Sequence, residues 1–289
     1  MKTFGSPKQR QRRRQSGLTL VEILVASTLL LVIVIGLMAA FNQTQRAFRN
    51  GIKDTDVSEG ARSALELIAR DVQQMSASQL QSNVNFHTGL SALAGLPVAI
   101  SNPTGGNLKT NVLQDMFFLS YATNWTGIGF QVLDPVRLDS GNIYGTLYRF
   151  STNSNQLYVN EFYGASLRLP SQLAQSGQLN RVLDGVVHFR VTPLNREGVS
   201  FEVLRNQGRL PSTNVVVGSD VLNSVVYGSN YEFQEREVPA YVEIELGIVE
   251  PVILEQLKSL PPAAQRQYLQ EQAGKMHIYR QQIPIRTAL

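Results

Sequence analysis

Hydrophobic residues are first concentrated in one long run near the N-terminus. The run Ile23–Phe41 covers 19 positions and is interrupted only by Ser27, Thr28 and Gly36. A helix of this length spans about 28 Å, close to the thickness of the hydrocarbon core of a bilayer. The pattern predicts a single membrane-spanning helix. The alternative is a secretory signal cut near Ala39-Ala40, although the apolar core of such a signal is normally shorter.

A second apolar pattern, with helical spacing, follows the membrane run. Residues 42–81 are largely compatible with a helix, and apolar side chains recur every three or four positions at Ala61, Ala64, Leu65, Ile68, Val72 and Met75. This stripe predicts an amphipathic helix that packs on a sheet. Gly51 and Gly60 each disfavour a helix by about 1 kcal/mol relative to alanine, so a bend or break is expected near them.

The rest of the chain carries strand signals separated by polar turns. The expected strands are residues 116–121, 145–150, 156–162, 186–191, 199–204, 241–246 and 276–285. Two turns are expected to join neighbouring strands into hairpins, one at residues 152–155 and one at residues 195–198. The clearest strand is Tyr241–Leu246, in which apolar residues alternate strictly with Glu243 and Glu245 and so predict one buried face.

One further helix is expected before the last strand. Pro261-Pro262 begins it, residues 263–273 form it and Gly274 ends it. Residues 81–111 and 206–230 are expected to be rich in loops. The fold class is therefore α+β: a long N-terminal helix, half transmembrane and half amphipathic, packed on an antiparallel β-sheet head.

Charge is distributed unevenly along the 289 residues. The formal net charge is +4, but six basic residues and no acidic residue lie in the first 17 positions: Lys2, Lys8, Arg10, Arg12, Arg13 and Arg14. Without them, 20 basic and 22 acidic residues leave a balance of −2. A surface that follows nucleic-acid phosphates is therefore not expected. The basic stretch instead predicts that the N-terminus stays in the cytoplasm while the remainder crosses the membrane.

Residue types that carry chemistry are sparse. There is no cysteine, which excludes disulfides and thiol catalysis, and His87, His188 and His277 are too far apart for a metal-ligand spacing. No motif of a metalloprotease, serine hydrolase or phosphate-binding loop occurs. Residues 139–142 could bind calcium, but a β-turn is the commoner explanation of Asp-Ser-Gly-Asn. We expect no enzyme activity, no cofactor and no metal.

Glu22 is the unusual residue of the apolar segment. A carboxylate near the bilayer centre costs about 2.5–3.5 kcal/mol, and less at the headgroups, where Glu22 would simply be solvated. A specific role requires a partner for its charge. If the chain were cut after Gly17, Leu18 would gain an ammonium group, and Glu22 would lie about 6 Å along the helix from it. The amine of a neighbouring subunit could then pair with Glu22 in a medium of low dielectric constant.

The N-terminal elements together resemble the type IV prepilin N-terminus, the class III signal. They are the basic leader, Gly17-Leu18-Thr19-Leu20-Val21-Glu22 and about twenty apolar residues. The resemblance implies that a prepilin peptidase cuts between Gly17 and Leu18 and methylates the amine of Leu18, and that Glu22 guides assembly. Leu18 departs from the phenylalanine usual in the family. The implied segments are a removed leader at 1–17, a transmembrane and filament-core helix at 18–41 and a pilin-like globular head at 42–289.

A second resemblance is to the J-type pseudopilins of type II secretion and the W-type minor pilins. It rests on residues 183–190, 238–246 and 279–285, which look like successive strands of those subunits, and on the preceding Arg70-Asp71 pair. These subunits are larger than the major pilin and act near the filament tip. Residues 250–275 form an insertion that departs from their compact pattern.

The leading hypothesis is a minor pilin or pseudopilin that assembles into the tip of a type IV pilus or a type II secretion pseudopilus. The expected partners are a prepilin peptidase, other pilin-like subunits and the inner membrane, which the chain crosses once with its head in the periplasm. One alternative is a ligand-binding tip protein, adhesin-like or for DNA uptake, that uses loops 81–111 and 206–230. Another is a signal-anchored periplasmic protein that never polymerises.

Overall fold

The computed structural model describes residues 19–78, 84–91, 98–100, 109–133, 143–154, 179–222 and 225–286. Gly17 and Leu18 lie outside the described residues, as do the expected loop at 101–107, the turn at 139–142 and the strand at 156–162. The chain divides into two compact units, Met1–Ile52 and Lys53–Leu289.

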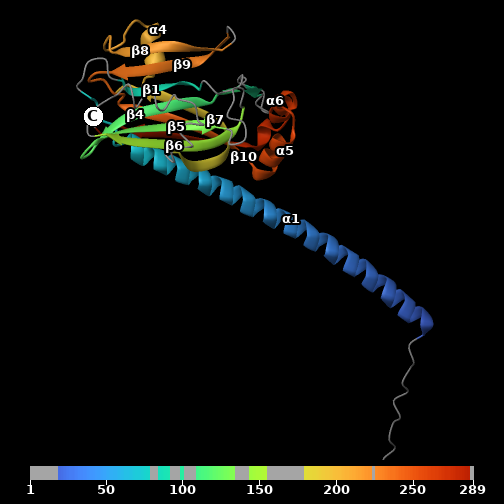
Figure 1. The fold of residues 1–289 in the computed structure, drawn as a ribbon. Helices are drawn as coiled ribbons and strands as arrows, with labels where there is room; N and C mark the ends of the chain where they lie inside the picture. The colour runs from blue at the N-terminus through green and yellow to red at the C-terminus, as the bar shows by residue number, and fades with distance from the viewer. Residues whose placement is uncertain are drawn as a thin grey trace, which may run out of the picture. The chain divides into compact units, whose positions relative to one another are not determined.

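The first element is the helix α1 (Leu20–Val72), which runs without interruption for 53 residues (Figure 1). The expected break at Gly51 or Gly60 is therefore wrong, because the cost of one glycine is small beside the many good helix formers on both sides. Gly60 has a packing role instead: a Cβ there would lie 3.2 Å from Leu183 Cδ1 in the strand β7 (Leu179–Leu194). Met75 lies beyond the helix, is fully buried and forms an isolated antiparallel β-bridge with Ser120 of the sheet.

The head contains a nine-stranded sheet in which every strand pairing is antiparallel, with the order β11-β10-β7-β6-β5-β4-β1-β9-β8. Its strands besides β7 are β1 (Val84–Leu90), β4 (Gln114–Tyr121), β5 (Trp125–Leu133), β6 (Gly145–Ser154), β8 (Val215–Leu222), β9 (Val225–Gln234), β10 (Tyr241–Val249) and β11 (Met276–Pro284). The short strands β2 (Val98–Ile100) and β3 (Lys109–Asn111) form a separate pair. The α+β class and the antiparallel sheet are confirmed.

Strong apolar patterns located several strands correctly. Residues 116–121 lie in β4, 186–191 in β7, 241–246 in β10 and 276–284 in β11. In β10 the alternation has the expected result, because Val242, Ile244 and Leu246 are fully buried while Glu243 and Glu245 lie on the opposite face. The three segments compared with J-type and W-type subunits contribute to β7, β10 and β11, which are consecutive neighbours in the sheet.

Other sequence predictions are wrong. The expected loop at 81–111 contains β1, and the expected loop at 206–230 contains β8 and the first part of β9. The strand β5 was not expected at all. Residues 152–154, predicted as a turn, continue β6. The strand expected at 199–204 is the helix α4 (Phe201–Asn206), since the Ser200 hydroxyl accepts a hydrogen bond from Val203 N at 3.4 Å and caps it. The neighbour of β7 at this end is β10.

A helical insertion lies between β10 and β11. It comprises α5 (Pro251–Ser259), α6 (Pro262–Glu271) and the single 3-10 turn η1 (Ala273–Lys275), so the expected helix is α6 and a second helix precedes it. Figure 1 shows α5 and α6 side by side at one end of the sheet. Their buried Leu257 and Leu269 pack in one cluster with Val187 of β7 and Val249 of β10.

The core of the head lies between the C-terminal part of α1 and one face of the sheet. The predicted helical stripe is buried as expected, and Ile68 packs in one cluster with Phe118, Phe189 and Ile244. Burial of these side chains is the main source of stability for the head.

Replacing Ile68 by alanine should therefore lower the free energy of unfolding by about 2–5 kcal/mol, because it removes buried methyl groups and leaves a cavity. Arg62→Ala, at an exposed position of the same helix, should change the stability by less than about 0.5 kcal/mol. Denaturant unfolding of the full chain in detergent micelles measures both. Equal losses for the two variants would contradict the placement of the core.

Candidate functional site

The N-terminal end of α1 is closed by a reciprocal contact between Thr19 and Glu22. The backbone N–H and the hydroxyl of Thr19 donate to Glu22 Oε2 at 3.2 and 3.3 Å, and the N–H of Glu22 donates to Thr19 Oγ1 at 3.3 Å. This is a capping box, in which the residue before the helix and the third helical residue satisfy each other's free backbone N–H groups.

The capping box places Glu22 where a negative charge is favourable. The first turn of a helix carries a partial positive charge from its free N–H groups, which stabilises a nearby carboxylate. Both bonds from Thr19 use Oε2, so the carboxylate is oriented by its own chain, and the side chain of Glu22 is exposed. Of the predicted processing and assembly residues, Glu22 is the one that the structure describes.

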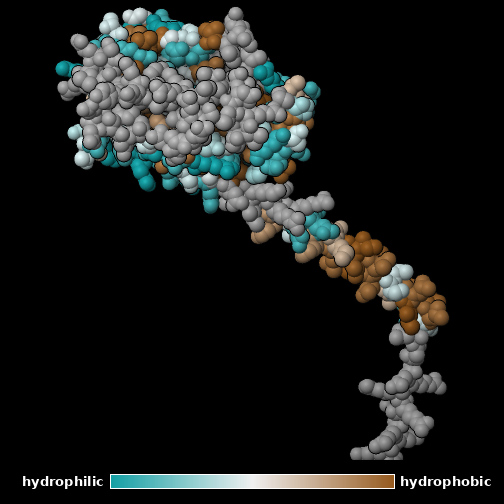
Figure 2. Space-filling model, in the orientation of Figure 1, coloured by the Kyte–Doolittle hydropathy of each residue, from teal (hydrophilic) through white to brown (hydrophobic). Residues whose placement is uncertain are grey.

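The helix surface that follows is apolar and uncovered. The segment Leu20–Gln45 is long and apolar enough to cross a membrane, and none of it is buried in the structure. Figure 2 shows its apolar side chains along this part of α1 in brown. Leu20, Leu30, Val32 and Met38, for example, are each at least 65 % exposed. So large an apolar surface on one helix marks a site that lipid or other protein helices cover.

The polar side chains within this apolar surface bond to the helix itself. The hydroxyls of Ser27, Thr28 and Thr44 donate to the carbonyl oxygens of Leu24, Val25 and Ala40 at 2.9, 2.8 and 2.9 Å. Each hydroxyl thus has a partner without water, as a low-dielectric environment requires. The interruptions of the apolar run are therefore compatible with a membrane or a packed filament core.

The three histidines do not converge. His87 lies in β1, His188 in β7 and His277 in β11, and no group of metal-ligating side chains forms among the residues that the structure describes. His188 is buried and hydrogen-bonded: its Nδ1 accepts from Val112 N at 3.1 Å, so Nε2 carries the hydrogen that faces Glu245 Oε2 at 3.2 Å.

The Arg70-Asp71 pair has a structural role at the end of α1. Asp71 is buried and accepts hydrogen bonds from Arg149 of β6, at 2.6 Å from Nε and 3.4 Å from Nη2. The bond joins the last turn of the helix to the sheet. The partner lies 78 positions away in the sequence, so no local pattern indicates this contact.

A mixed-charge groove of about 460 Å³ lies at the end of the head where β7 ends and β10 begins. Its charged residues are Arg196, Glu197, Arg236 and Glu237, and Phe201 contributes an apolar wall. Among the described residues of the two predicted ligand loops, 81–111 and 206–230, Pro211 alone lines this groove, because most described residues of 206–230 form β8 and β9.

Residues 12–38 match the model of a family described as the prokaryotic N-terminal methylation motif. The chain therefore carries a type IV prepilin-like signal of class III, and the match supports a type IV pilin-like protein. The motif implies processing by a prepilin peptidase and assembly with other pilins. Comparisons with curated proteins and with solved structures give no match.

Proposed function

We propose that the chain is a minor pilin or pseudopilin that assembles into the tip of a type IV pilus or a type II secretion pseudopilus. The observation that carries the proposal is the N-terminal half of α1. An uncovered apolar surface, Leu20–Gln45, lies largely within the matched prepilin motif at residues 12–38, and one carboxylate, that of Glu22, takes part in the capping box of its first turn.

The mechanism is charge-guided assembly. A cut between Gly17 and Leu18 creates an ammonium group one residue before Thr19. The Leu18 amine of one subunit and the Glu22 carboxylate of its neighbour then neutralise each other in the apolar surroundings, where an unpaired charge is costly. The capping box supports this role because it holds the carboxylate at the end of the helix.

Packing against other subunits replaces lipid as the anchor leaves the bilayer. Van der Waals contacts between apolar helices are comparable with contacts to lipid tails, so extraction does not expose the apolar surface to water. The proposed segments are a leader at 1–17, a membrane and filament-core helix at 18–41 and a head at 42–289. The basic leader favours a cytoplasmic N-terminus and a periplasmic head.

A position near the tip is supported by the size of the head and by its sheet. The segments similar to J-type and W-type subunits supply the neighbouring strands β7, β10 and β11. The insertion α5–α6 enlarges the head at one end of these strands and contributes its own apolar cluster.

Photo-crosslinking from the apolar surface tests this function. A crosslinking amino acid at Leu31, which is 62 % exposed, should capture other pilin-like subunits in cells that contain the prepilin peptidase and should lose these products without it. The same probe at exposed Arg62 on the polar face is the matched control and should not give the same products.

Crosslinks that form equally well without the peptidase would contradict assembly through the processed N-terminus. An uncleaved chain with no subunit crosslinks would favour the signal-anchored periplasmic protein. The ligand-binding alternative predicts instead that the head binds a surface or glycan without other subunits, and the mixed-charge groove is the place at which to test it.

A further inference from the structure

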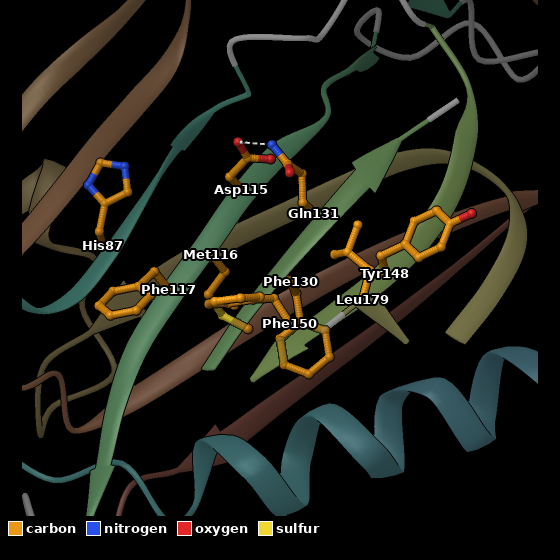
Figure 3. Close-up of a pocket in the computed structure, with 10 residues that line it drawn as sticks. His87, Asp115, Met116, Phe117, Phe130, Gln131, Tyr148, Phe150 and Leu179 are labelled. Atoms are coloured by element: carbon orange, nitrogen blue, oxygen red, sulfur yellow. Dashed lines mark hydrogen bonds between the residues drawn. The ribbon is translucent and has the colours of Figure 1, made fainter. Parts of the chain in front are cut away.

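A small cavity lies beside the strands β4 and β5, on the face of the sheet that carries His87 and Phe117. Its volume is about 10 Å³, enough for about one water molecule. Asp115, Gln131 and Tyr148 bring polar groups to its lining, and the remaining side chains are largely apolar (Figure 3). Asp115 and Gln131 are almost completely buried, at 6 % and 8 % exposure.

One hydrogen bond joins Asp115 to Gln131, and among the described residues one oxygen atom of each side chain has no hydrogen-bond partner. Gln131 Nε2 donates to Asp115 Oδ2 at 2.8 Å and makes a longer contact of 3.5 Å with Ser91 Oγ. In the described part of the chain, Asp115 Oδ1 and Gln131 Oε1 have no hydrogen-bond partner, although both atoms are buried. Both are acceptors when Asp115 is ionised, so neither can satisfy the other.

We propose that Asp115 is a carboxylic acid in the folded head and forms a reciprocal acid–amide pair with Gln131. The O–H group of the protonated Asp115 Oδ1 donates a hydrogen bond to Gln131 Oε1, while Gln131 Nε2 continues to donate to Asp115 Oδ2. One proton thus gives partners to both unpartnered oxygen atoms. Figure 3 shows the two head groups facing each other from neighbouring strands.

The charge surroundings favour the proton. Burial raises the pKa of Asp115 to about 7, although hydrogen bonds from Ser91 and Gln131 lower it in part. Burial also lowers the pKa of His87 to about 4, so its imidazole is neutral near pH 7 and supplies no cation. Among the described residues, strand pairing or contact brings four further titratable side chains to this face of the sheet: Tyr148 of β6, Arg181 of β7, Asp220 of β8 and Glu232 of β9.

A metal ion fits the site less well than a proton. Among the described residues that line the cavity, Asp115 is the one carboxylate, and hard cations such as Ca²⁺ require six to eight oxygen ligands. The described residues also contain no group of three metal-ligating side chains.

The pair makes folding depend on pH with a defined sign. An unfolded aspartate has a pKa of about 3.9, so between about pH 4 and 7 the folded head holds a proton that the unfolded chain has lost. The factor that Asp115 contributes to the folding equilibrium constant therefore falls about tenfold for each unit of pH between about 4 and 7. Above about pH 7 this factor is constant. His87 acts oppositely between about pH 4 and 6.5, because its folded-state pKa is lowered.

The contributions of Asp115 and His87 to the pH dependence of folding largely cancel in the wild type. The test therefore compares the folding equilibrium constant of an Asp115 variant with that of the wild type. In Asp115→Asn, the new amide donates to Gln131 Oε1 at every pH. Chemical unfolding of the full chain in detergent micelles should show its folding equilibrium constant, relative to wild type, rising about tenfold per unit between pH 4.5 and 6.5, about 100-fold in all. Glu197→Gln, an exposed carboxylate removed in the same way, should change the ratio less than about twofold.

Parallel curves for Asp115→Asn and wild type would overturn the proposal. Infrared spectroscopy of the wild-type chain gives a test that does not depend on the variant folding. A band of a protonated carboxyl group should disappear with a midpoint near pH 7, where the exposed carboxyl groups are already ionised. Absence of that band at pH 6 would likewise overturn the proposal.

Discussion

Replacing Gly17 by alanine is expected to leave the chain as a full-length precursor in the membrane. The proposed cut directly follows Gly17, which has no side chain, so the methyl group of alanine adds an atom next to the scissile bond and should block cleavage. Immunoblots of membranes from cells that contain a prepilin peptidase should show the longer band for Gly17→Ala and the shorter band for wild type.

Gly36→Ala is the matched control for this experiment. It makes the same substitution within the apolar helix, at a position where an added Cβ meets no atom within 4 Å. This variant should be processed as the wild type is, and a defect specific to it would point to a secretory cut near Ala40. Efficient processing of Gly17→Ala would contradict the assignment of the scissile bond.

Replacing Glu22 by alanine is expected to permit cleavage but prevent most incorporation into filaments. The variant keeps the residues on both sides of the cut, but removes the carboxylate that would pair with the amine of a neighbouring subunit. It also removes one half of the capping box and the negative charge in the first turn, which contributes about 0.3–1 kcal/mol to the helix. The ratio of subunit in the sheared filament fraction to subunit in the membrane measures the effect.

Two further variants separate charge from capping. Glu22→Gln keeps an oxygen that can accept from Thr19 but removes the charge, so it should incorporate as poorly as Glu22→Ala. Thr19→Val removes the hydroxyl from the box but keeps the carboxylate, so it should retain much of the incorporation. Normal incorporation of Glu22→Gln would refute charge pairing, and failure of Thr19→Val alone would make helix capping the dominant role of the contact.

The sequence predicted features that depend on local pattern. The apolar run, the stripe that includes Ile68 and the alternation in Tyr241–Leu246 each determine which face of an element is buried, and the structure confirms the last two in detail. Such patterns are readable because each side chain's environment follows from the period of a single helix or strand.

Strands that mix glycine and polar residues could not be located in this way. In β1, Asn85 and Thr88 are buried where a loop was predicted. Asn85 can be buried because its Oδ1 accepts from Ser78 N and its Nδ2 donates to the carbonyls of Glu235 and Glu237. In β9 the glycine and serine residues belong to a hairpin that the sheet stabilises. Their burial depends on pairing between distant segments, which local propensity does not contain.

The contact between Thr19 and Glu22 could be predicted from a local sequence pattern, whereas the contact between Asp115 and Gln131 could not. Thr19 and Glu22 have the Thr-x-x-Glu spacing of a capping box, so the sequence contained a signal for their contact. Asp115 and Gln131 lie 16 residues apart and meet because β4 pairs with β5 in the observed register. No local spacing indicates such a contact before the register is known.

The most direct test of the prepilin interpretation is mass spectrometry of the N-terminal peptide from the membrane-extracted protein, produced with the host's prepilin peptidase. We predict a chain that begins at Leu18 with a methylated amine. A chain that still begins at Met1, or one that begins near Ala40, would contradict entry into the pilin pathway.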